Sequence, residues 1–462
     1  MPLLGSRGAA SSRGFGSLAN LGYFLRNSLR FRGSNNAYLS RTPASAGTGT
    51  GKTWTWSGWV KRGTIGSSDL ISLMYGATSG GASDRGGFGF YTFSGGGTGS
   101  DSLTLYYNAN FANNLTTTQV FRDPSAWYHI IYAVDTTQAT ASNRVKLYVN
   151  GVQVTDFSAS NYPTQNYQFA IGNNVAQWIS SEAGTQRYFD GYLAELNFID
   201  GQALTPSSFG KTDAATGQWI PKQYSGTYGT NGFYLPFTNT TSTSTLVADS
   251  SGNGNNWTPN NISLTAGVTY DSMTDVSTLG PTASNYAVLN PLANGGGTLS
   301  GGNLNMLGAS SAWGTRLSTI AVSSDKWYCE ITPTSGSSTQ GIMFGISNFI
   351  TPPSGHLGAG STSYGYYGAD GALNFNGSST PAFGATVADN DVVGIALDLT
   401  AGTLEYYKNN VKQGTTITGI SGQFYFGVSC YGTATASINF GQRPFAYTPP
   451  SGFKSLNAFN LP

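Results

Sequence analysis

The chain has 462 residues and a net charge of +1, and 9% of its residues are charged, against roughly 25% in an average globular protein. This length predicts two or three domains, and a hydrophobic share of 39% excludes a disordered chain. Two cysteines exclude a disulfide scaffold, and no apolar stretch reaches the roughly 18 residues that a membrane-spanning helix needs. Abundant glycine, threonine and aromatic residues favour strands joined by turns, so we predict an all-β protein.

Residues 1–27 form a basic N-terminal arm rich in glycine and serine. Nine lysine and arginine residues and no acidic residue precede Asp69, which leaves the rest of the chain acidic. A basic arm on an acidic body suggests docking to an acidic surface, and a solvated tail is the simpler alternative. The residues through which the arm is predicted to attach to its partner are Arg7, Arg13, Phe15 and Arg26. Basic residues interrupt any apolar segment of the arm, which does not read as a secretory signal. We therefore expect synthesis in a cytoplasm.

Residues 46–53, AGTGTGKT, lack one glycine of a phosphate-binding loop. A working loop of that kind needs a buried strand before it and a helix after it. Here Pro43 interrupts the preceding segment, and the following TWTWSGWV alternates like a strand. We therefore expect a turn between strands, with Lys52 adding to a basic face.

Residues 28–205 consist of short alternating runs of strand length. In WYHIIYAV, residues 127–134, both faces are largely apolar, which is typical of a central strand in a two-layer sandwich. Asn150 and Gly151 separate two further runs and tolerate positive φ, which predicts a two-residue hairpin turn. The pattern predicts an antiparallel β-sandwich.

Residues 206–285 are dense in glycine, asparagine, threonine, serine and proline, and they are expected to form a connector packed on the sandwiches. Within them, Asp249, Asn253 and Asn255 offer oxygen ligands for a calcium ion. One carboxylate supplies little charge for calcium, and asparagine–glycine turns explain the same residues, so calcium is not favoured.

Residues 286–462 repeat the sandwich pattern with a new set of short runs. In TLEYYKNNVKQ, Asn409 and Asn410 stand at a second predicted hairpin turn. The chain is therefore predicted to hold two tandem antiparallel β-sandwiches behind a short anchoring arm.

Catalytic groups are scarce. His129 lies mid-strand beside Trp127 and is expected to be a core residue, and the sequence suggests no partner for His356. The four glutamates are far apart in the sequence, so no two of them share a strand as a carboxylate pair would. We expect no enzymatic activity.

Groups suited to binding are more plentiful, because aromatic rings stack on sugars or partner side chains while amides orient the ligand. The segment SYGYYGADGALNFNG concentrates such residues, although some of its tyrosines are expected to be core. Two tryptophans stand in segments that read as loops. The candidate ligand-binding residues are Tyr364, Tyr366, Tyr367, Asp370, Asn374, Trp178 and Trp313.

Two stretches resemble known families. FRGSNNAYL at 31–39 and FDGYLAE at 189–195 resemble the opening and closing phrases of a laminin-G-like, concanavalin A-type jelly roll, which implies that fold for residues 28–205. KWYCEI, GIMFGISN, YGYYGADGALNFNG and DLTAGTLEYYKNN follow the order typical of a SPRY domain, which implies a SPRY-type sandwich within residues 286–462.

This combination is similar to tail-fibre and virion-appendage proteins of bacteriophages. The resemblance implies a virion protein, assembled in the host cytoplasm and acting outside the cell. Its arm would bind other virion proteins, and its sandwiches would bind a host surface glycan or protein. We further expect no cofactor, no nucleic-acid partner and no membrane insertion, and a homo-oligomer is compatible with the sequence. No coiled coil or β-helical shaft is apparent, so a compact appendage fits as well as a fibre. A glycan-depolymerising tailspike and a cellular secreted adhesin are the alternatives.

Overall fold

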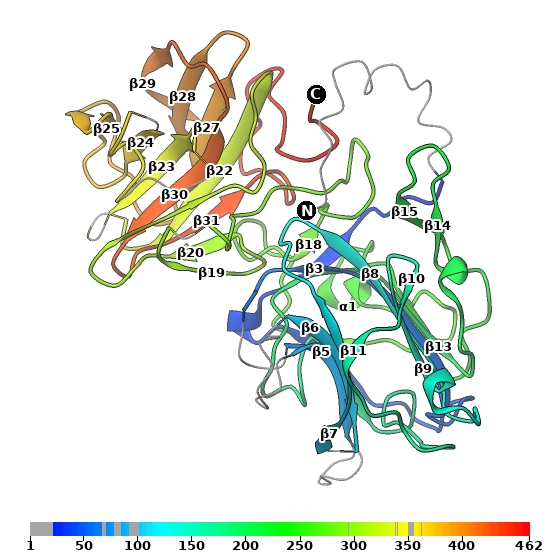
Figure 1. The fold of residues 1–462 in the computed structure, drawn as a ribbon. Helices are drawn as coiled ribbons and strands as arrows, with labels where there is room; N and C mark the ends of the chain where they lie inside the picture. Colours follow the sequence, from blue (N-terminus) through cyan, green and yellow to red (C-terminus); the bar gives the residue numbers. More distant parts are fainter. Residues whose placement is uncertain are drawn as a thin grey trace.

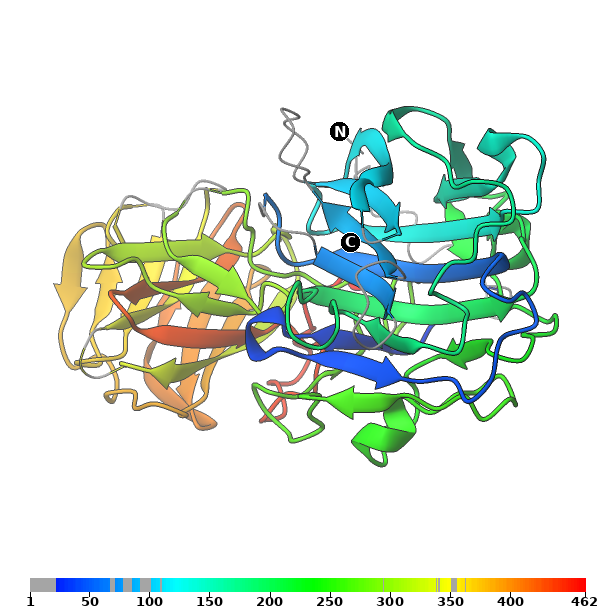
Figure 2. The same cartoon turned by 90° about the horizontal axis from the view of Figure 1, so that it is seen from below.

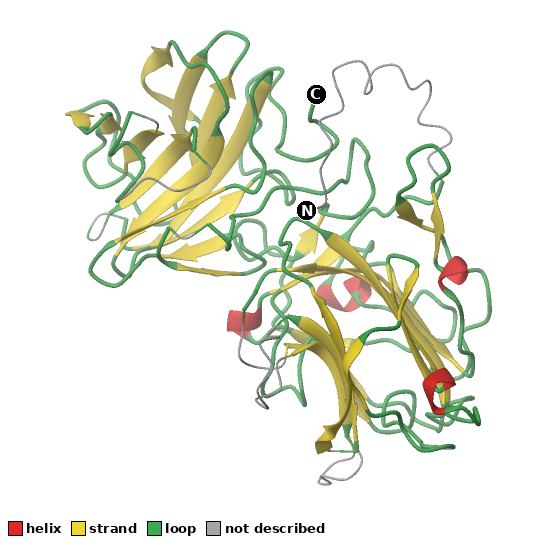
Figure 3. Ribbon diagram, in the orientation of Figure 1, coloured by secondary structure: helices red, strands yellow, loops and turns green. Residues whose placement is uncertain are grey.

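The computed structural model describes residues 22–462 except 67–70, 78–84, 92–100, 109, 294, 338, 340, 350–354 and 362. Arg7, Arg13 and Phe15 lie outside the described residues. The described chain consists of antiparallel strands and short helical turns, and it forms two bodies that lie side by side in both views (Figures 1, 2 and 3). The prediction of an all-β protein with two sandwiches is confirmed. No helix of the described part is long and apolar enough to span a bilayer.

The first sandwich has two eight-stranded sheets. One, which we call the junction sheet, runs in the order β10–β9–β8–β3–β13–β1–β18, with β16 paired to β13. Its strands are β1 (Ser28–Phe31), β3 (Thr53–Arg62), β8 (Trp127–Asp135), β9 (Val145–Val149), β10 (Val152–Val154), β13 (Gly191–Asp200), β16 (Phe233–Leu235) and β18 (Ser272–Met273).

The other sheet, which we call the opposite sheet, runs in the order β11–β7–β6–β5–β4–β12–β2–β17. Its strands are β2 (Tyr38–Arg41), β4 (Ile71–Ala77), β5 (Gly86–Tyr91), β6 (Ser102–Tyr107), β7 (Asn110–Val120), β11 (Phe157–Ser160), β12 (Ala176–Ile179) and β17 (Thr258–Asn260). Short 3-10 turns cover Gly33–Asn35, Ala141–Asn143 and Pro206–Ser208.

Alternation along β3 lets one strand serve two cores. Trp54 and Trp56 point into the first sandwich, where both rings pack on Phe88 at centroid distances of 6.4 and 5.1 Å. Trp59 and Lys61 lie on the other face and are buried against the second sandwich and the segment that leads into it. The outer face of the junction sheet is therefore an interface.

The segment 206–285, predicted to pack on the sandwiches as a connector, adds strands to both sheets of the first one. β16 and β18 extend the junction sheet, and β17 extends the opposite sheet. The hairpin of β14 (Gly210–Thr212) and β15 (Trp219–Pro221) forms a small sheet of its own. Ser242 caps helix α1 (Thr243–Leu246), and its hydroxyl accepts from the amide of Thr245 in a capping box.

The second sandwich has a seven-stranded sheet in the order β19–β20–β31–β22–β27–β28–β29. Its strands are β19 (Thr298–Ser300), β20 (Asn305–Leu307), β22 (Lys326–Ser335), β27 (Val393–Asp398), β28 (Thr403–Lys408), β29 (Val411–Thr418) and β31 (Thr435–Asn439). A six-stranded sheet, β21–β30–β23–β24–β25–β26, faces it and consists of β21 (Trp313–Leu317), β23 (Ile342–Ser347), β24 (Ser363–Tyr367), β25 (Leu373–Phe375), β26 (Ser378–Thr380) and β30 (Tyr425–Tyr431).

Both predicted hairpin turns are confirmed. Asn150 and Gly151 have φ of 48° and 82° and join β9 to β10. Asn409 and Asn410 have φ of 48° and 67° and join β28 to β29. These are left-handed conformations that asparagine and glycine adopt most easily. Lys52 closes a turn that leads directly into β3, as expected for a segment that is not a phosphate loop.

The expected basic face is wrong for four of the nine basic residues that precede Asp69. All four are buried, because the chain folds acidic residues from later in the sequence against them. Each guanidinium or ammonium group lies within 3.1 Å of a buried carboxylate. The pairs are Arg30 and Arg32 with Asp271, Lys61 with Asp275, and Arg62 with Asp101.

The two sandwiches share a continuous hydrophobic core at their junction. Tyr192 and Ala194, on the outer face of β13, pack in one cluster with Leu304 of the second sandwich. The hydroxyl of Tyr192 donates to the carbonyl of Gly302 at 2.8 Å. Leu25, from the last part of the predicted arm, is 3% exposed in the same cluster. Leu25 therefore packs where the two sandwiches meet.

Candidate functional site

Four aromatic side chains gather on the outer face of the six-stranded sheet, and we call them the aromatic cluster. Trp313 begins β21, Tyr431 ends β30, Tyr367 ends β24, and His356 lies in the loop 355–361. Trp313 is central, with ring centroids at 5.0 Å from His356, 5.5 Å from Tyr431 and 6.1 Å from Tyr367.

Strand register brings these rings together. Trp313 lies directly across from Tyr431 in the β21–β30 pair, and Tyr367 lies across from Met343 in the β23–β24 pair. Gly341, with φ of 101°, lies beneath two of the rings. A Cβ at this glycine would lie 2.9 Å from the Tyr367 hydroxyl and 3.2 Å from the Trp313 ring, so any side chain here would displace the cluster.

The loop 355–361 is held onto this face. Leu357 is fully buried, and its amide donates to the hydroxyl of Ser429 at 3.0 Å. The Thr315 hydroxyl donates to a loop carbonyl, also at 3.0 Å. His356 Nδ1 is 2.9 Å from the carbonyl of Leu357, which can only accept, so Nδ1 carries the proton. In the neutral ring, Nε2 is then an acceptor.

The aromatic cluster suits an uncharged, polar, ring-shaped ligand. Tyr431 is 36% exposed, and Trp313, Tyr367 and His356 are half-buried. Their rings offer apolar faces, and the tyrosine hydroxyls and the imidazole offer hydrogen-bonding groups at the margins. Flat apolar faces beside a few polar groups are what stacking and oriented hydrogen bonding to a sugar require.

The structure brings together Tyr367 and Trp313 of the predicted ligand residues. The expectation that Trp313 lies in a loop was wrong, because the residue belongs to β21. The prediction of Tyr366 as a ligand contact was also wrong. Alternation along β24 turns its side chain into the core, where it is fully buried and its hydroxyl donates to the carbonyl of Ala385. Tyr364 shares that inner face and stacks on Phe375 at 4.2 Å.

The other predicted ligand residues lie apart from the cluster or at its edge. Asp370 is exposed, and its carboxylate accepts from the amide of Ala372 at 2.9 Å, which shapes a turn. Asn374 is half-buried, with Nδ2 at 4.0 Å from the sulfur of Met343. Trp178 lies in β12 of the first sandwich and not in a loop, which corrects that expectation.

Tyr431 and His356 were not predicted as site residues. No local pattern marks them, because each contacts Trp313 only through long-range strand pairing or a folded-back loop. Both residues are separated from Trp313 by far more residues than one hairpin contains, so the periodicity of the sequence does not indicate that they meet it.

Comparison with known families agrees with the two sandwiches. Residues 33–209 match the family described as the concanavalin A-like lectin/glucanases superfamily. Residues 326–443 match the SPRY domain. The chain is a concanavalin A-like domain followed by a SPRY domain.

Three solved structures show a limited similarity to part of the chain. The SPRY domain of human HERC1 has a TM-score of 0.28 and 16% identity, covering 31% of this chain and 91% of that one. The TRIM65 PSpry domain has a TM-score of 0.27 and 17% identity, covering 33% and 92%. Stonustoxin has a TM-score of 0.27 and 17% identity, covering 33% and 27%. No curated protein matched the sequence.

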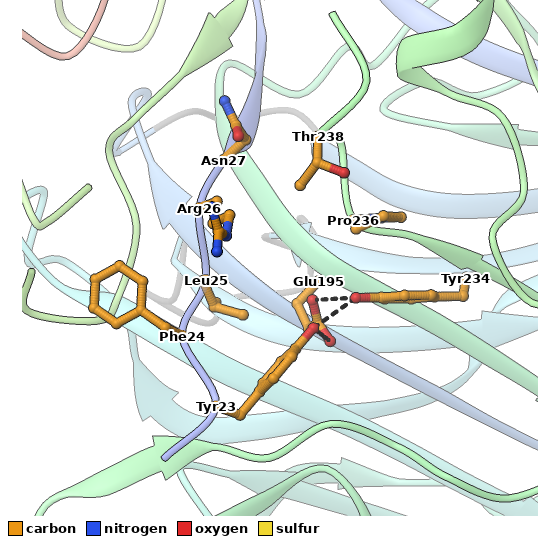
Figure 4. A pocket seen from close by; sticks show the side chains of 9 residues that line it. All are labelled: Tyr23, Phe24, Leu25, Arg26, Asn27, Glu195, Tyr234, Pro236 and Thr238. Carbon is orange, nitrogen blue, oxygen red and sulfur yellow. Dashed lines mark hydrogen bonds between the residues drawn. The ribbon is translucent and has the colours of Figure 1, made fainter. Parts of the chain in front are cut away.

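A pocket of about 290 Å³ lies where the arm meets the concanavalin A-like domain (Figure 4). The carboxylate of Glu195 accepts from the hydroxyl of Tyr23 at 2.8 Å and from that of Tyr234 at 2.9 Å. Burial raises the pKa of Glu195 to about 7. Glu195 has φ of 54° at a bulge in β13, and Arg26 lines the same pocket. The predicted attachment residue Arg26 therefore lies on the folded body.

His129 of the concanavalin A-like domain is a core residue, as predicted. Its ring stacks on Trp59 at 4.7 Å, and Trp219 Nε1 donates to its Nδ1 at 2.9 Å. Nε2 then carries the proton and donates to Ser57 at 2.8 Å. Burial lowers the pKa of His129 to about 3, which keeps the ring neutral.

The residues considered for calcium form a hydrogen-bonded turn. The Asp249 carboxylate accepts from the amides of Tyr234, Ser251 and Asn255 at 2.8 to 2.9 Å. The side chains of Asn253 and Asn255 donate to main-chain carbonyls nearby. The Asp249 oxygens are thus already used by N–H groups, which is the arrangement of a closed asparagine- and aspartate-rich turn.

Proposed function

We propose that the chain is a non-enzymatic, surface-binding structural protein of a bacteriophage particle, anchored by its N-terminal residues, whose SPRY domain binds a host surface glycan through the aromatic cluster. The observation that supports glycan binding is the aromatic cluster itself. Its four aromatic side chains are partly exposed on an otherwise well-packed sheet. The two tyrosines and the tryptophan carry no charge. A rigid aromatic surface of this kind loses little conformational entropy when a ligand stacks on it.

The partners of the glutamates support the non-enzymatic part of the proposal. Glu182 is paired with Arg187, Glu330 accepts from the amides of Ala446 and Tyr447, and Glu405 is paired with Lys412. Glu195 lies between two tyrosines. Each carboxylate therefore has a structural role of its own, whereas glycoside hydrolysis requires two that face the same bond.

Replacing Trp313 with alanine is expected to weaken glycan binding by at least tenfold, because this ring contacts the other three members of the aromatic cluster and presents the largest flat surface. A tenfold loss corresponds to about 1.4 kcal/mol. Host surface glycans selected on an array would be titrated calorimetrically against wild type and variant.

The matched control is Phe349→Ala, which removes an aromatic ring that is 55% exposed. Phe349 follows the C-terminal end of β23, which ends at Ser347. We expect this control to bind like wild type. Equal affinities for Trp313→Ala and wild type would contradict the glycan site, and oligosaccharide products in the titration mixture would contradict the non-enzymatic proposal.

Deleting residues 1–21 is expected to leave both domains folded and to abolish incorporation into phage particles. The deletion stops there because Leu25 is buried at the junction and Tyr23 is bonded to Glu195. Incorporation would be measured by immunoblot of purified particles, with thermal unfolding as the check on folding. Full incorporation of a folded, truncated protein would refute the anchoring role, and absence of the full-length protein from particles would favour a cellular adhesin.

A further inference from the structure

The outer side of the opposite sheet in the concanavalin A-like domain carries a second row of aromatic rings, in which Tyr75 and Tyr106 are buried and Trp178 is half-buried. Tyr75 of β4 lies directly across from Trp178 of β12, with ring centroids 5.7 Å apart. Tyr106 of β6 lies 6.5 Å from Tyr75 on the other side. Gly87 lies between these two tyrosines in the register, and a Cβ there would lie 3.1 Å from the Tyr75 ring. The missing side chain lets rings from β12, β4 and β6 form a row that crosses four strands.

Charged side chains border this row. Glu182 is buried, with its side chain 2% exposed, and it accepts from the Tyr106 hydroxyl at 3.2 Å. Arg187 pairs with one oxygen of this carboxylate, and Arg85 lies 3.8 Å from the other. The side chains of Arg187 and Arg85 are 22% and 34% exposed. Among these side chains, two partly exposed cations thus face one buried anion.

The backbone that carries Glu182 is held in an unfavourable conformation. Ser180, Ala183 and Arg187 have φ of 73°, 57° and 58° within eight residues, and none is a glycine. Left-handed conformations at such residues cost free energy and persist only where the surroundings enforce them. Here they accompany an inward-directed Glu182 and an Arg187 whose guanidinium pairs with it.

We propose that this surface binds an acidic sugar, with the carboxylate of a uronic acid on Arg187 and Arg85 and the face of its pyranose ring on Trp178. A planar guanidinium donates two hydrogen bonds to a carboxylate in a fixed geometry, and an adjacent indole supplies the stacking surface. This goes beyond the proposed function, since it concerns the other domain and a charged ligand. Tyr75 links the two parts of the site, because its ring contacts Trp178 and its hydroxyl interacts with Arg85.

The test is calorimetric titration of the full chain with tetramers of galacturonate, mannuronate and glucuronate, each beside its methyl ester, which keeps the sugar and removes the charge. We expect at least one acidic tetramer to bind and its ester to bind at least tenfold more weakly. Arg85→Ala is the main variant, because it leaves the Arg187–Glu182 pair intact, and it should lose at least tenfold. Trp178→Ala should lose a similar factor, which separates stacking from charge attraction.

Two control variants complete the test. Lys146→Gln removes one positive charge from the junction sheet of the same domain and should bind like wild type. Trp313→Ala should also retain the acidic tetramer, because its ring belongs to the SPRY domain. Absence of binding by all three acids at millimolar concentration, equal binding of the esters, or full binding by Arg85→Ala would each overturn the proposal. If Trp313→Ala were the only variant to lose binding of the acidic tetramer, the acid would bind to the SPRY domain, and the proposal would be overturned as well.

Discussion

Replacing Asp271 with alanine is expected to lower the free energy of unfolding by about 3–5 kcal/mol, since it would leave two buried guanidinium groups without their anion. Arg30 and Asp271 have fully buried side chains, and that of Arg32 is 9% exposed. Both Nε atoms donate to the same carboxylate oxygen, at 3.1 and 2.9 Å. Arg30 retains three carbonyl acceptors in the variant, but these do not neutralise its charge.

The measurement is urea denaturation of wild type and variant, read as the shift in midpoint at constant slope. The control is Asp325→Ala, which breaks the ion pair with Lys454, where both side chains are more than one third exposed. Exposed pairs contribute about 0–1 kcal/mol, so this control should unfold almost like wild type. Similar shifts for both variants would show that the buried carboxylate is not required to hold β1 in place.

Replacing Glu195 with glutamine is expected to stabilise the protein at alkaline pH and to have little effect at pH 4.5. The folded pKa of Glu195, about 7, lies above the unfolded value of 4.5 because burial disfavours the charged carboxylate. As the pH rises from 4.5 to 7, the unfolded chain releases a proton that the folded chain keeps, so wild-type stability falls. The slope is about 1.4 kcal/mol per pH unit, which gives about 3 kcal/mol by pH 8. Glutamine does not titrate, and its carbonyl can still accept from a tyrosine.

Chemical denaturation at several pH values between 4.5 and 8 would measure this difference. His129 contributes the opposite trend below pH 6.5, but equally in both proteins, so it cancels. Glu405→Gln is the control, because the pKa of Glu405 is shifted in the opposite direction. Although partial burial favours the protonated acid, hydrogen bonds from Lys412 and its neighbours lower the pKa of Glu405 to about 2. Glu405 is therefore ionised in both states above pH 4.5, and its variant should differ from wild type by a nearly constant amount. A constant difference for Glu195→Gln as well would contradict the prediction.

Local chemistry was sufficient to predict much of the fold. Asn150 and Asn409 adopt the left-handed conformations that their hairpins require, and residues 127–134 form a central strand because both of their faces are apolar. His129 was expected in the core for the same reason. These features depend on neighbours in the sequence, where side-chain size and backbone preference decide the outcome.

The site depends on information that local patterns lack. Tyr366 and Tyr367 are adjacent and chemically alike, and only the position of the second sheet decides which one is buried. Trp313 meets Tyr431 through a strand pair whose register is set across more than a hundred residues. Likewise, the basic residues near the N-terminus could not be assigned to ion pairs, because Asp271 and Asp275 are brought to them only by the closing strands.

The position of β1 has a mechanical consequence. This strand follows directly on residues 22–27 and lies between β13 and β18, with hydrogen bonds to both. Tension applied to the chain before residue 22 would act along the strand axis and load both ladders at once, in shear, instead of opening bonds one at a time. The Arg30 side chain, held by Asp271, adds a third point of resistance. A pull on the chain before residue 22 is thus met by two strand ladders and a buried ion pair, so the two domains would stay in place.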